Sequence, residues 1–373
     1  MTEKAFIIAG EPSGDNLAAC LMRSQKKRYE WHGMGGPAMM KEGLSSLADY
    51  SALHVLGIFQ ALSRYHSLKS LLNKLVDDAC TLRPSVIFTI DAKAFSVRFA
   101  KAMRQKMAEQ GWHAPIIHMV APTIWAYGEG RKNAFEEYFD GMLCLFPMEQ
   151  GLFNETAVKI GYIGHPSAYQ EPISRQIDTT QRRLLLLPGS RRREVETLLP
   201  LFLKTAQILS QDKPLSTSIV TTTAMKPLVS RLVGANDVQI YESEGQLQKQ
   251  MATHHLCLAA SGTVTLESAL CAIPGIVAYK LNPILKLIMQ WRFKQKDPVL
   301  ANIILQNETY PFCFQSQVNA VHMASLLGAQ FADFDSVNSQ MAHHAASLRQ
   351  SLRPYECDFE TAIATAISNM KLT

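Results

Sequence analysis

The chain of 373 residues is 47% hydrophobic and 18% charged. That length exceeds what a single hydrophobic core usually supports, so two domains are expected. The composition excludes a disordered protein, because it supplies enough apolar side chains for large cores. A net charge of +5 fits an anionic ligand or an anionic membrane surface better than nucleic-acid binding, which is not expected.

The cysteines and the apolar runs indicate the environment of the protein. Seven cysteines are present, none in a C-x-x-C pair, and several lie in apolar runs, as Cys257 does. We therefore expect buried, reduced thiols in a cytosolic protein and no metal site. The apolar run at residues 5–9 is shorter than the roughly 7 to 15 residues of a signal peptide's core. No run approaches the ~20 residues that cross a bilayer, so we expect a soluble or peripheral protein.

In the first half, short apolar runs alternate with amphipathic stretches, a pattern typical of a parallel sheet with crossover helices. The clearest predicted helix covers residues 58–76, where apolar side chains recur on one face. A polar, aperiodic stretch at 167–182 is interpreted as an interdomain linker. The predicted strands are 5–9, 86–90, 115–119, 141–145 and 159–163.

The alternation restarts after the linker, with a helix predicted from Arg191 and further helices from about residue 315. Each half thus opens with a strand, a Gly/Ser turn and a helix. We predict an α/β protein of two doubly wound, Rossmann-like domains facing a cleft, with ligands at the carboxyl ends of the strands. The domains are expected at 1–166 and 183–349, with a C-terminal helix at about 350–373 packing back on the first. The predicted strands of the second half are 183–187, 216–221, 238–241, 256–260 and 275–279.

Two turns of the second half are suited to a nucleotide diphosphate. Gly189 permits a tight turn close to a ligand, Ser190 is placed to cap the next helix with support from Glu194, and Arg191 offers two donors to a diphosphate. The free N–H groups and the dipole of that helix also favour a phosphate. An ordinary capped helix with a solvated basic turn is an equally good interpretation of these residues alone.

The second turn follows the strand at 256–260 and reads Ser-Gly-Thr-Val-Thr-Leu-Glu from Ser261 to Glu267. The carboxylate of Glu267 is placed to accept hydrogen bonds from a ribose, and the alternative is a capping box of Ser or Thr with this Glu. Neither a P-loop nor a G-x-G-x-x-G motif occurs, which disfavours an NTPase and dinucleotide redox chemistry.

The first half carries acidic and glycine-rich turns at its strand ends. Asp91 ends the strand at 86–90, where it is placed to act as a general base or, alternatively, as the cap of the next helix. Glu11 and Asp15 follow the first strand, and Asp15 has the same alternative as a cap. Three glycines within residues 33–36 predict the close approach of a ligand or of another backbone segment. His165, before the linker, is interpreted as structural.

Two stretches combine apolar and basic residues in the manner of helices that lie on a bilayer. These are residues 58–75 and residues 282–296, the latter reading NPILKLIMQWRFKQK. Core helices or partner surfaces are the alternative interpretation.

Taken together, these segments resemble the lipid-A-disaccharide synthase family, whose members are glycosyltransferases of the GT-B fold. The resemblance covers nearly the whole chain, and its most specific segments are AGEPSGD at 9–15 and GMGGPAM at 33–39. Blocks such as PGSR and SGTVTLE also look like those of other nucleotide-sugar transferases. Further matching segments are TID at 89–91, APTIWAY at 121–127, FPME at 146–149, GHP at 164–166, LLPGSRRREVETLLPLFL at 186–203, AASGTVTLESAL at 259–270 and LANIILQNETYP at 300–311.

The resemblance implies an inverting transfer at the cytoplasmic face of a Gram-negative inner membrane, with no cofactor and no metal. UDP-2,3-diacylglucosamine would donate its sugar to 2,3-diacylglucosamine 1-phosphate, giving a β-1,6-linked disaccharide 1-phosphate and UDP. The partners are therefore two acylated sugars and a membrane surface, with a homodimer as one candidate assembly. Residues 58–75 and 282–296 would help to take acylated substrates from a bilayer.

The resemblance also assigns residues. Asp91 matches the family's base for the attacking 6-hydroxyl, with Glu11 and Ser13 beside it as catalytic candidates. Asp15, Gly35 and Gly36 fall on the acceptor side. The residues implied to bind the UDP-sugar are Gly189, Ser190, Arg191, Ser261, Gly262, Thr263, Thr265, Glu267, Asn302 and Glu308.

Three segments depart from the family's usual pattern. Pro-Asp-Phe-Asn after the base is replaced by Ala92, Lys93, Ala94, Phe95 and Ser96. Trp-Ala-Trp-Arg ends here in Gly128, and Ala-Gly-Arg-Glu becomes Leu305, Gln306, Asn307 and Glu308. The departures predict a variant substrate or a low activity. A UDP-N-acetylglucosamine 2-epimerase-like enzyme and a non-catalytic binding relative are the alternative hypotheses.

Overall fold

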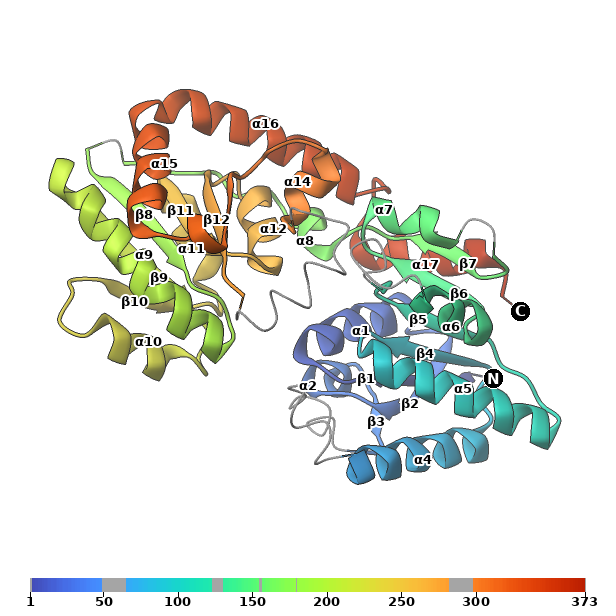
Figure 1. The fold of residues 1–373 in the computed structure, drawn as a ribbon. Coiled ribbons are helices and arrows are strands. Elements are labelled where there is room, and N and C mark those ends of the chain that lie inside the picture. The colour runs from blue at the N-terminus through green and yellow to red at the C-terminus, as the bar shows by residue number, and fades with distance from the viewer. Residues whose placement is uncertain are drawn as a thin grey trace. The chain divides into compact units, whose positions relative to one another are not determined.

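The computed structural model describes residues 2–48, 65–122, 130–153, 156–178, 180–281 and 298–372 (Figure 1). The chain divides into two compact units. The first comprises Met1–Pro166 together with Leu352–Thr373, and the second comprises Ser167–Ser351. Each is an α/β unit with helices on both faces of a parallel sheet, which confirms the predicted fold class.

Within the described residues, the sheet of the first unit has seven strands in the order β3-β2-β1-β4-β5-β6-β7, and neighbouring strands run parallel. Its central strand, β4, is buried along its whole length, because parallel strands are covered by helices on both faces. The strands are β1 (Glu3–Ala9), β2 (Tyr29–Met34), β3 (Ser45–Ser46), β4 (Val86–Ile90), β5 (Ile116–Met119), β6 (Gly141–Cys144) and β7 (Lys159–Tyr162).

The helices of the first unit pack on an apolar core that includes Phe6, Phe88 and Phe99. The C-terminal helix α17 contacts β6 and β7, where Gly141 and Gly161 leave room for it. A Cβ atom on either glycine would lie 2.7 Å from Leu372 Cδ1 or Met370 Cε, respectively. The helices are α1 (Pro12–Ser24), α2 (Pro37–Lys41), α4 (Tyr65–Leu82), α5 (Lys93–Gln110), α6 (Gly130–Tyr138), α7 (Pro147–Gln150), η2 (Gly151–Phe153) and α17 (Phe359–Met370).

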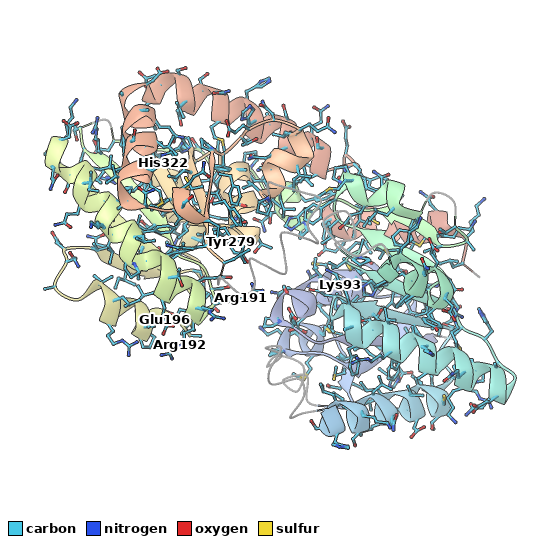
Figure 2. The ribbon with its side chains drawn as sticks, in the orientation of Figure 1. Lys93, Arg191, Arg192, Glu196, Tyr279 and His322 are labelled. Carbon is cyan, nitrogen blue, oxygen red and sulfur yellow. The ribbon has the colours of Figure 1, made fainter. Side chains whose placement is uncertain are left out.

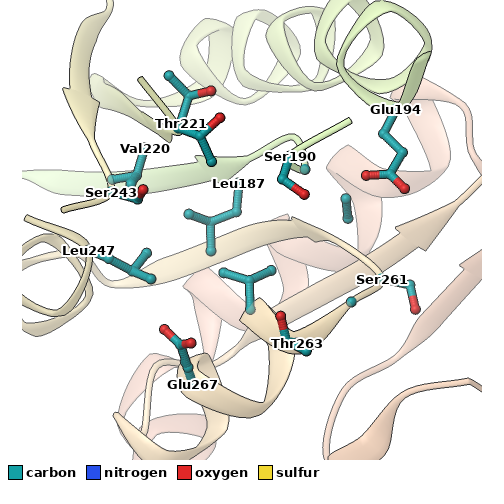
Figure 3. Close-up of a pocket in the computed structure, with 15 residues that line it drawn as sticks. Leu187, Ser190, Glu194, Val220, Thr221, Ser243, Leu247, Ser261, Thr263 and Glu267 are labelled. Atoms are coloured by element: carbon teal, nitrogen blue, oxygen red, sulfur yellow. The ribbon is translucent and has the colours of Figure 1, made fainter. Parts of the chain in front are cut away.

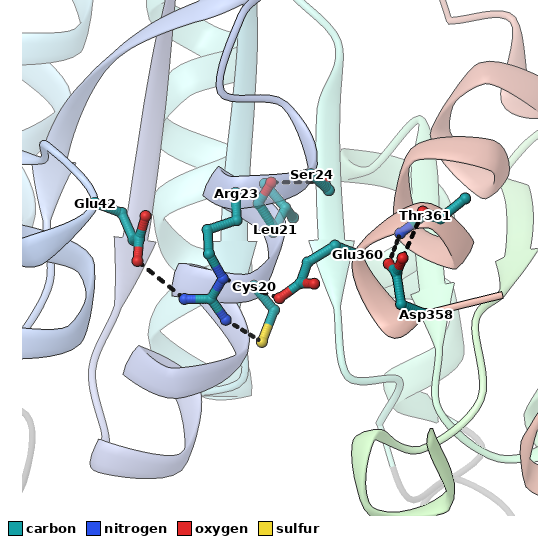
Figure 4. Close-up of polar contacts among 8 residues, drawn as sticks. All are labelled: Cys20, Leu21, Arg23, Ser24, Glu42, Asp358, Glu360 and Thr361. Carbon is teal, nitrogen blue, oxygen red and sulfur yellow. Dashed lines mark hydrogen bonds and ion pairs between the residues drawn. The ribbon is translucent and has the colours of Figure 1, made fainter. Parts of the chain in front are cut away.

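An arginine joins the C-terminal helix to the start of the chain (Figure 4). The Nε atom of Arg23, on α1, donates to Glu360 Oε1 of α17 at 2.9 Å, and its Nη1 atom donates to Glu42 Oε1 at 3.0 Å. Asp358 begins α17 by accepting from the backbone N–H of Thr361 at 2.7 Å. Residues more than three hundred positions apart thus form one unit.

In the described part of the second unit, six parallel strands follow the order β10-β9-β8-β11-β12-β13. The strands are β8 (Arg182–Leu187), β9 (Leu215–Thr221), β10 (Gln239–Glu242), β11 (Leu256–Ala260), β12 (Gly275–Tyr279) and β13 (Phe312–Phe314). The helices that cover them are α9 (Arg192–Asp212), α10 (Lys226–Val233), α11 (Leu247–Thr253), α12 (Thr263–Leu270), α14 (Leu300–Leu305), η3 (Gln315–Gln317), α15 (Ala320–Ala332) and α16 (Phe334–Leu352); α8 (Pro166–Tyr169) begins at the boundary.

The predicted linker lies against the second unit rather than free of it. The Arg175 guanidinium donates to the backbone carbonyls of His254, His255 and Ala272, and burial lowers its pKa to about 10. Arg349 of α16 donates in turn to the carbonyls of Ala168 and Gln170. Hydrogen bonds in both directions thus hold this stretch to that unit.

The sequence patterns located most strands to within a residue or two, but the list of predicted strands lacks β2, β3 and β13, which have six, two and three residues. Of the predicted helix at 58–76, the structure describes the part from Tyr65, and α4 continues to Leu82. Residues 58–64 and 282–296 lie outside the described residues. Among the described helices, none is both long and apolar enough to cross a membrane.

Asp15 connects α1 to the glycine turn at residues 33–36. Its Oδ1 atom accepts from the N–H groups of Gly36 (2.8 Å) and Met39 (3.1 Å), and its Oδ2 atom accepts from Ala38 (2.9 Å). Asp15 therefore caps the start of α2, not of its own helix, and is 4% exposed. The glycines of this turn are needed because other parts of the protein pack closely against them. A Cβ on Gly33 would lie 2.0 Å from the Ile7 carbonyl oxygen, and one on Gly35 would lie 2.2 Å from Met39 Sδ.

Replacing this carboxylate tests its structural role. We expect Asp15→Ala to lower the free energy of unfolding by about 3 kcal/mol, because three N–H groups lose a charged acceptor. The exposed Asp237 is the matched control, and Asp237→Ala should change stability by less than about 0.5 kcal/mol. Equilibrium urea unfolding measures both. Equal losses in the two variants would contradict the capping role.

Candidate functional site

A pocket of about 300 Å³ opens at the carboxyl ends of β8, β9, β10 and β11 in the second unit (Figure 3). Side chains and backbone from all four strand ends reach it, as expected for an open parallel sheet. It is lined by Leu187, Gly189, Ser190, Glu194, Val220, Thr221, Thr222, Ser243, Leu247, Ala260, Ser261, Gly262, Thr263, Val264 and Glu267.

The turn after β8 forms one wall of this pocket. Gly189 has φ +100°, which favours glycine, and a Cβ there would lie 2.6 Å from Glu194 Oε2. The expectation that Ser190 caps the helix is wrong, because α9 begins at Arg192 and the N-cap position falls to Arg191. The Ser190 hydroxyl therefore does not cap this helix, and the residue lines the pocket. Arg191 is 81% exposed and pairs with Glu194 at 3.2 Å.

The turn after β11 forms the facing wall. Its helix, α12, has Gly262 as N-cap residue, and a glycine has no side chain to build the capping box considered above. The Thr265 hydroxyl is buried and donates to the Gly262 carbonyl at 2.8 Å, so it shapes the turn. Ser261 and Thr263 line the pocket with their hydroxyl groups.

Glu267 is the carboxylate of this wall, across the pocket from Glu194 in Figure 3. Burial raises its pKa. Within the described part of the chain, no group donates a hydrogen bond to it. A partly buried acceptor that faces a pocket is suited to a hydroxyl-bearing ligand such as a ribose.

Two predicted donor-site residues lie elsewhere. Asn302 is buried, and both ends of its amide bind the backbone of Tyr310: Nδ2 donates to the carbonyl at 2.8 Å and Oδ1 accepts from the N–H at 2.9 Å. It therefore closes the loop between α14 and β13. Glu308, in that loop, is exposed, and neither residue is part of the pocket lining.

The first unit gathers a second set of predicted residues at the carboxyl ends of β1 and β4. These strands are neighbours, with Ala9 opposite Ile90, so Glu11 and Ser13 start α1 at the same sheet edge as Asp91. The alternative that Asp91 caps α5 is wrong, because the N-cap residue is Ala92. The carboxylate of Asp91 is instead 28% exposed and lies 3.6 Å from Lys93 Nζ.

This edge carries backbone strain that no sequence motif indicated. Asp91 (φ +48°) and Ala92 (φ +40°) are consecutive left-handed residues, and Val120, at the end of the adjacent strand β5, has φ +81°. A positive φ is rare for a β-branched residue such as valine. Strained residues of this kind cluster at ligand-binding and catalytic sites, which supports a functional role for the edge.

Two buried titratable groups that interact electrostatically with Lys93 were not singled out by the motif analysis. Glu149 is 1% exposed and accepts from the N–H groups of Leu145 (2.9 Å) and Phe146 (3.0 Å); burial raises its pKa to about 7 despite these donors and Lys93. Burial lowers the pKa of His118 to about 3, and its Nδ1 atom lies 2.7 Å from the Thr89 hydroxyl. The pKa shifts of both groups are caused by burial in the folded protein, which a local sequence pattern does not reveal.

The surroundings of His165 and the state of the cysteines bear on the roles expected for them. His165 stacks on Phe146 with ring centroids 5.7 Å apart, its backbone N–H donates to the Leu352 carbonyl, and burial lowers its pKa to about 4. All seven cysteines lie in the described part of the chain and are free thiols. Among the described residues, no group of three His, Cys, Asp or Glu side chains is placed to hold a metal ion.

Comparison with known proteins identifies relatives over almost the full length. The family model "Lipid-A-disaccharide synthetase" matches residues 5–367. The lipid-A-disaccharide synthase of Alteromonas mediterranea is 30% identical, over 97% of this chain and 96% of that protein. That of Rhodospirillum centenum is 32% identical, over 86% of this chain and 82% of that protein.

Solved structures support the fold. A putative UDP-N-acetylglucosamine 2-epimerase from Listeria monocytogenes has a TM-score of 0.61 at 13% identity, covering 100% of this chain and 96% of that one. A glycotransferase of kitacinnamycin has a TM-score of 0.62 at 12% identity, covering 99% of both chains. At these identities the likeness shows the fold alone, and it confirms the predicted GT-B architecture.

The buried Glu149 predicts a specific pH dependence of stability. Its pKa in the folded protein, about 7, is above its ordinary value of 4.5, so the folded state holds the proton more tightly and stability falls as pH rises through this range. Relative to Glu149→Gln, the wild type should lose about 3 kcal/mol of unfolding free energy between pH 4.5 and 7.5. Urea unfolding at several pH values measures this difference.

The exposed Glu109 provides the control, since Glu109→Gln should follow the wild type at every pH. A difference between the wild type and Glu149→Gln that stays constant with pH would refute the raised pKa.

Proposed function

Because the chain belongs to the lipid-A-disaccharide synthetase family, we propose that it joins UDP-2,3-diacylglucosamine to 2,3-diacylglucosamine 1-phosphate. It is a glycosyltransferase of lipid A biosynthesis. The products are a β-1,6-linked disaccharide 1-phosphate and UDP. The epimerase alternative loses its support, because two epimerase structures share the fold at 13% and 10% identity whereas the family match covers residues 5–367.

The observation that carries the proposal is the pocket between the starts of α9 and α12. Both helices begin at its walls, so their unpaired N–H groups and dipoles favour the diphosphate of the donor. Gly189 lets the backbone approach the phosphates, and Ser190, Ser261 and Thr263 add hydroxyl donors. The carboxylate of Glu267 accepts from the ribose hydroxyls.

The chemistry is a single displacement. Asp91 takes the proton from the 6-hydroxyl of the acceptor, whose oxygen attacks carbon 1 of the donor sugar. The bond from carbon 1 to the β-phosphate oxygen breaks as the new bond forms, and the electron pair leaves with UDP. The first turn of α9 stabilises the charge on that leaving group, because its N–H groups are already oriented. Glu11 and Ser13 share the sheet edge with Asp91 and are proposed to hold the acceptor sugar.

Two substitutions separate the proposed roles. Asp91→Asn should lower the rate of disaccharide formation at least 100-fold while UDP binds as before, because the base is lost and the donor pocket is intact. Glu267→Ala should weaken UDP binding about 10-fold or more, because a charged acceptor is removed. Mass spectrometry of the product and calorimetric titration with UDP measure the two effects.

The control is Glu196→Ala on the exposed side of α9, which should change neither quantity. Normal product formation by Asp91→Asn would exclude this residue as the base. Unchanged UDP binding by Glu267→Ala would remove the carboxylate from the donor site.

We further propose that the protein works at the anionic, cytoplasmic surface of an inner membrane. Both substrates carry acyl chains, and the segment at 282–296 combines basic residues with large apolar ones. That segment lies outside the described residues, so the proposal rests on its sequence.

Liposome flotation tests this proposal. We expect the protein to float with vesicles that contain acidic lipid and to remain unbound with neutral ones, because basic residues gain about 1 kcal/mol each near an anionic surface. A variant with the basic residues of the segment changed to Gln should lose binding; these are Lys286, Arg292, Lys294 and Lys296. Absence of wild-type binding to acidic vesicles would refute the membrane proposal.

A further inference from the structure

Lys93 occupies a position that its own helix does not favour. It is the first residue of α5, where the positive end of the helix dipole repels a cation (Figure 2). The turn that delivers it is strained, since Asp91 and Ala92 immediately before it are both left-handed. A position that costs stability in both ways points to a role outside folding.

The ammonium group is close to Asp91 but not hydrogen-bonded to it. Lys93 Nζ lies 3.6 Å from Asp91 Oδ1, which is longer than a hydrogen bond, and the two side chains are 29% and 28% exposed. Within the described residues, Lys93 donates no hydrogen bond to any acceptor. Its three N–H donors are therefore available to a ligand that reaches Asp91.

Lys93 supplies a positive charge beside titratable groups that supply none at neutral pH. Lys93 acts electrostatically on two buried groups, Glu149 and His118, and both of its interactions are those of a nearby positive charge. His118, whose pKa is lowered to about 3, is neutral at pH 7, while a fraction of Glu149 is negative. Without Lys93, a phosphate approaching this edge would meet carboxylates and no opposing charge from these groups.

The acceptor carries its charge next to its reacting hydroxyl. In a glucosamine ring, carbon 1 and carbon 5 both bond to the ring oxygen. The phosphate on carbon 1 and the hydroxymethyl group on carbon 5 therefore flank that oxygen along one edge of the sugar. A base that reaches the 6-hydroxyl needs a cation beside it if the phosphate is to be bound as well. Asp91 and Lys93 form such an adjacent pair.

We propose that Lys93 is a specificity-determining residue that binds the 1-phosphate of the acceptor while Asp91 binds its 6-hydroxyl. The inference rests on the proposed function. In the empty site the ammonium pairs with Asp91. When the acceptor binds, the phosphate takes over the ammonium, and the carboxylate is released to take the hydroxyl proton. The exchange has a low cost because an ion pair with this exposure contributes little.

Steady-state kinetics with two acceptors test the proposal: 2,3-diacylglucosamine 1-phosphate and the same sugar without its phosphate. Lys93→Met keeps the length of the side chain and removes the charge. It should raise the KM for the phosphorylated acceptor about 10-fold or more and leave the KM for UDP-diacylglucosamine and for the uncharged acceptor within twofold. Lys93→Arg should retain most of the affinity, because the charge is kept.

Lys106, exposed on the same helix, supplies the matched control: Lys106→Met should behave as wild type with both acceptors. Thermal stability of Lys93→Met should equal or exceed that of wild type, since a cation leaves a helix N-terminus. An equal change of KM for both acceptors, or no change for either, would overturn the role of Lys93.

Direct binding of the two acceptors, measured by calorimetry with short-chain analogues, distinguishes this inference from the proposed function. If wild type forms no disaccharide but binds the phosphorylated analogue in a Lys93-dependent way, the function fails and the phosphate site stands. If wild type forms disaccharide and Lys93→Met binds both analogues normally, the phosphate site fails and the function stands. Neither product nor phosphate-dependent binding would reject both.

Discussion

Central parallel strands that are buried on both faces can place polar chemistry only at their ends, and this constraint shapes both units. β4 and β11 are buried along their whole lengths, because helices cover both faces of each sheet. The next residues after each strand are therefore the first that can carry charge or contact a ligand. Asp91 follows β4, and the pocket turn from Ser261 follows β11. The same rule puts Gly189 after β8, where the orphan N–H groups of α9 begin.

The sequence predicted these positions well for the same reason. A buried parallel strand reads as a continuous apolar run, so its end is visible, and a Gly/Ser turn or an acid after it marks the sheet edge. Strands of two or three residues leave no such run. Hydrogen-bond partners were less predictable. Asp15 and Asn302 are residue types that often bind ligands, yet their polar atoms bind the backbone of α2 and of Tyr310. Only the tertiary fold brings these backbone groups close to the two side chains. The helix α9 begins one residue later than predicted, so the N-cap position falls on Arg191 and not on Ser190.

The backbone strain at the carboxyl ends of β4 and β5 could not be predicted from local sequence patterns either. Asp91, Ala92 and Val120 cost on the order of 1–3 kcal/mol each in left-handed conformations, and the apolar core of that unit offsets this cost. The strain turns the chain sharply after β4, so α5 begins at Lys93 instead of being capped by Asp91. The acid is thus left with a partly exposed carboxylate and a lysine beside it.

The two proposed phosphate sites are built in comparable ways. Among the described residues, the pocket lining of the second unit contains no lysine or arginine; its positive potential comes from helix N-termini, and Arg191 stands at its margin, paired with Glu194. In the first unit Lys93 is paired with Asp91. Each basic residue lies at the start of the helix that follows a central strand (Figure 2), and each pairs with a partly buried carboxylate. Such pairs contribute roughly 0–1 kcal/mol, so a substrate phosphate, with more charge and more acceptors, can displace the carboxylate at little cost. In the first unit, the carboxylate released in this exchange is the proposed base, which ties proton abstraction to the arrival of a charged acceptor.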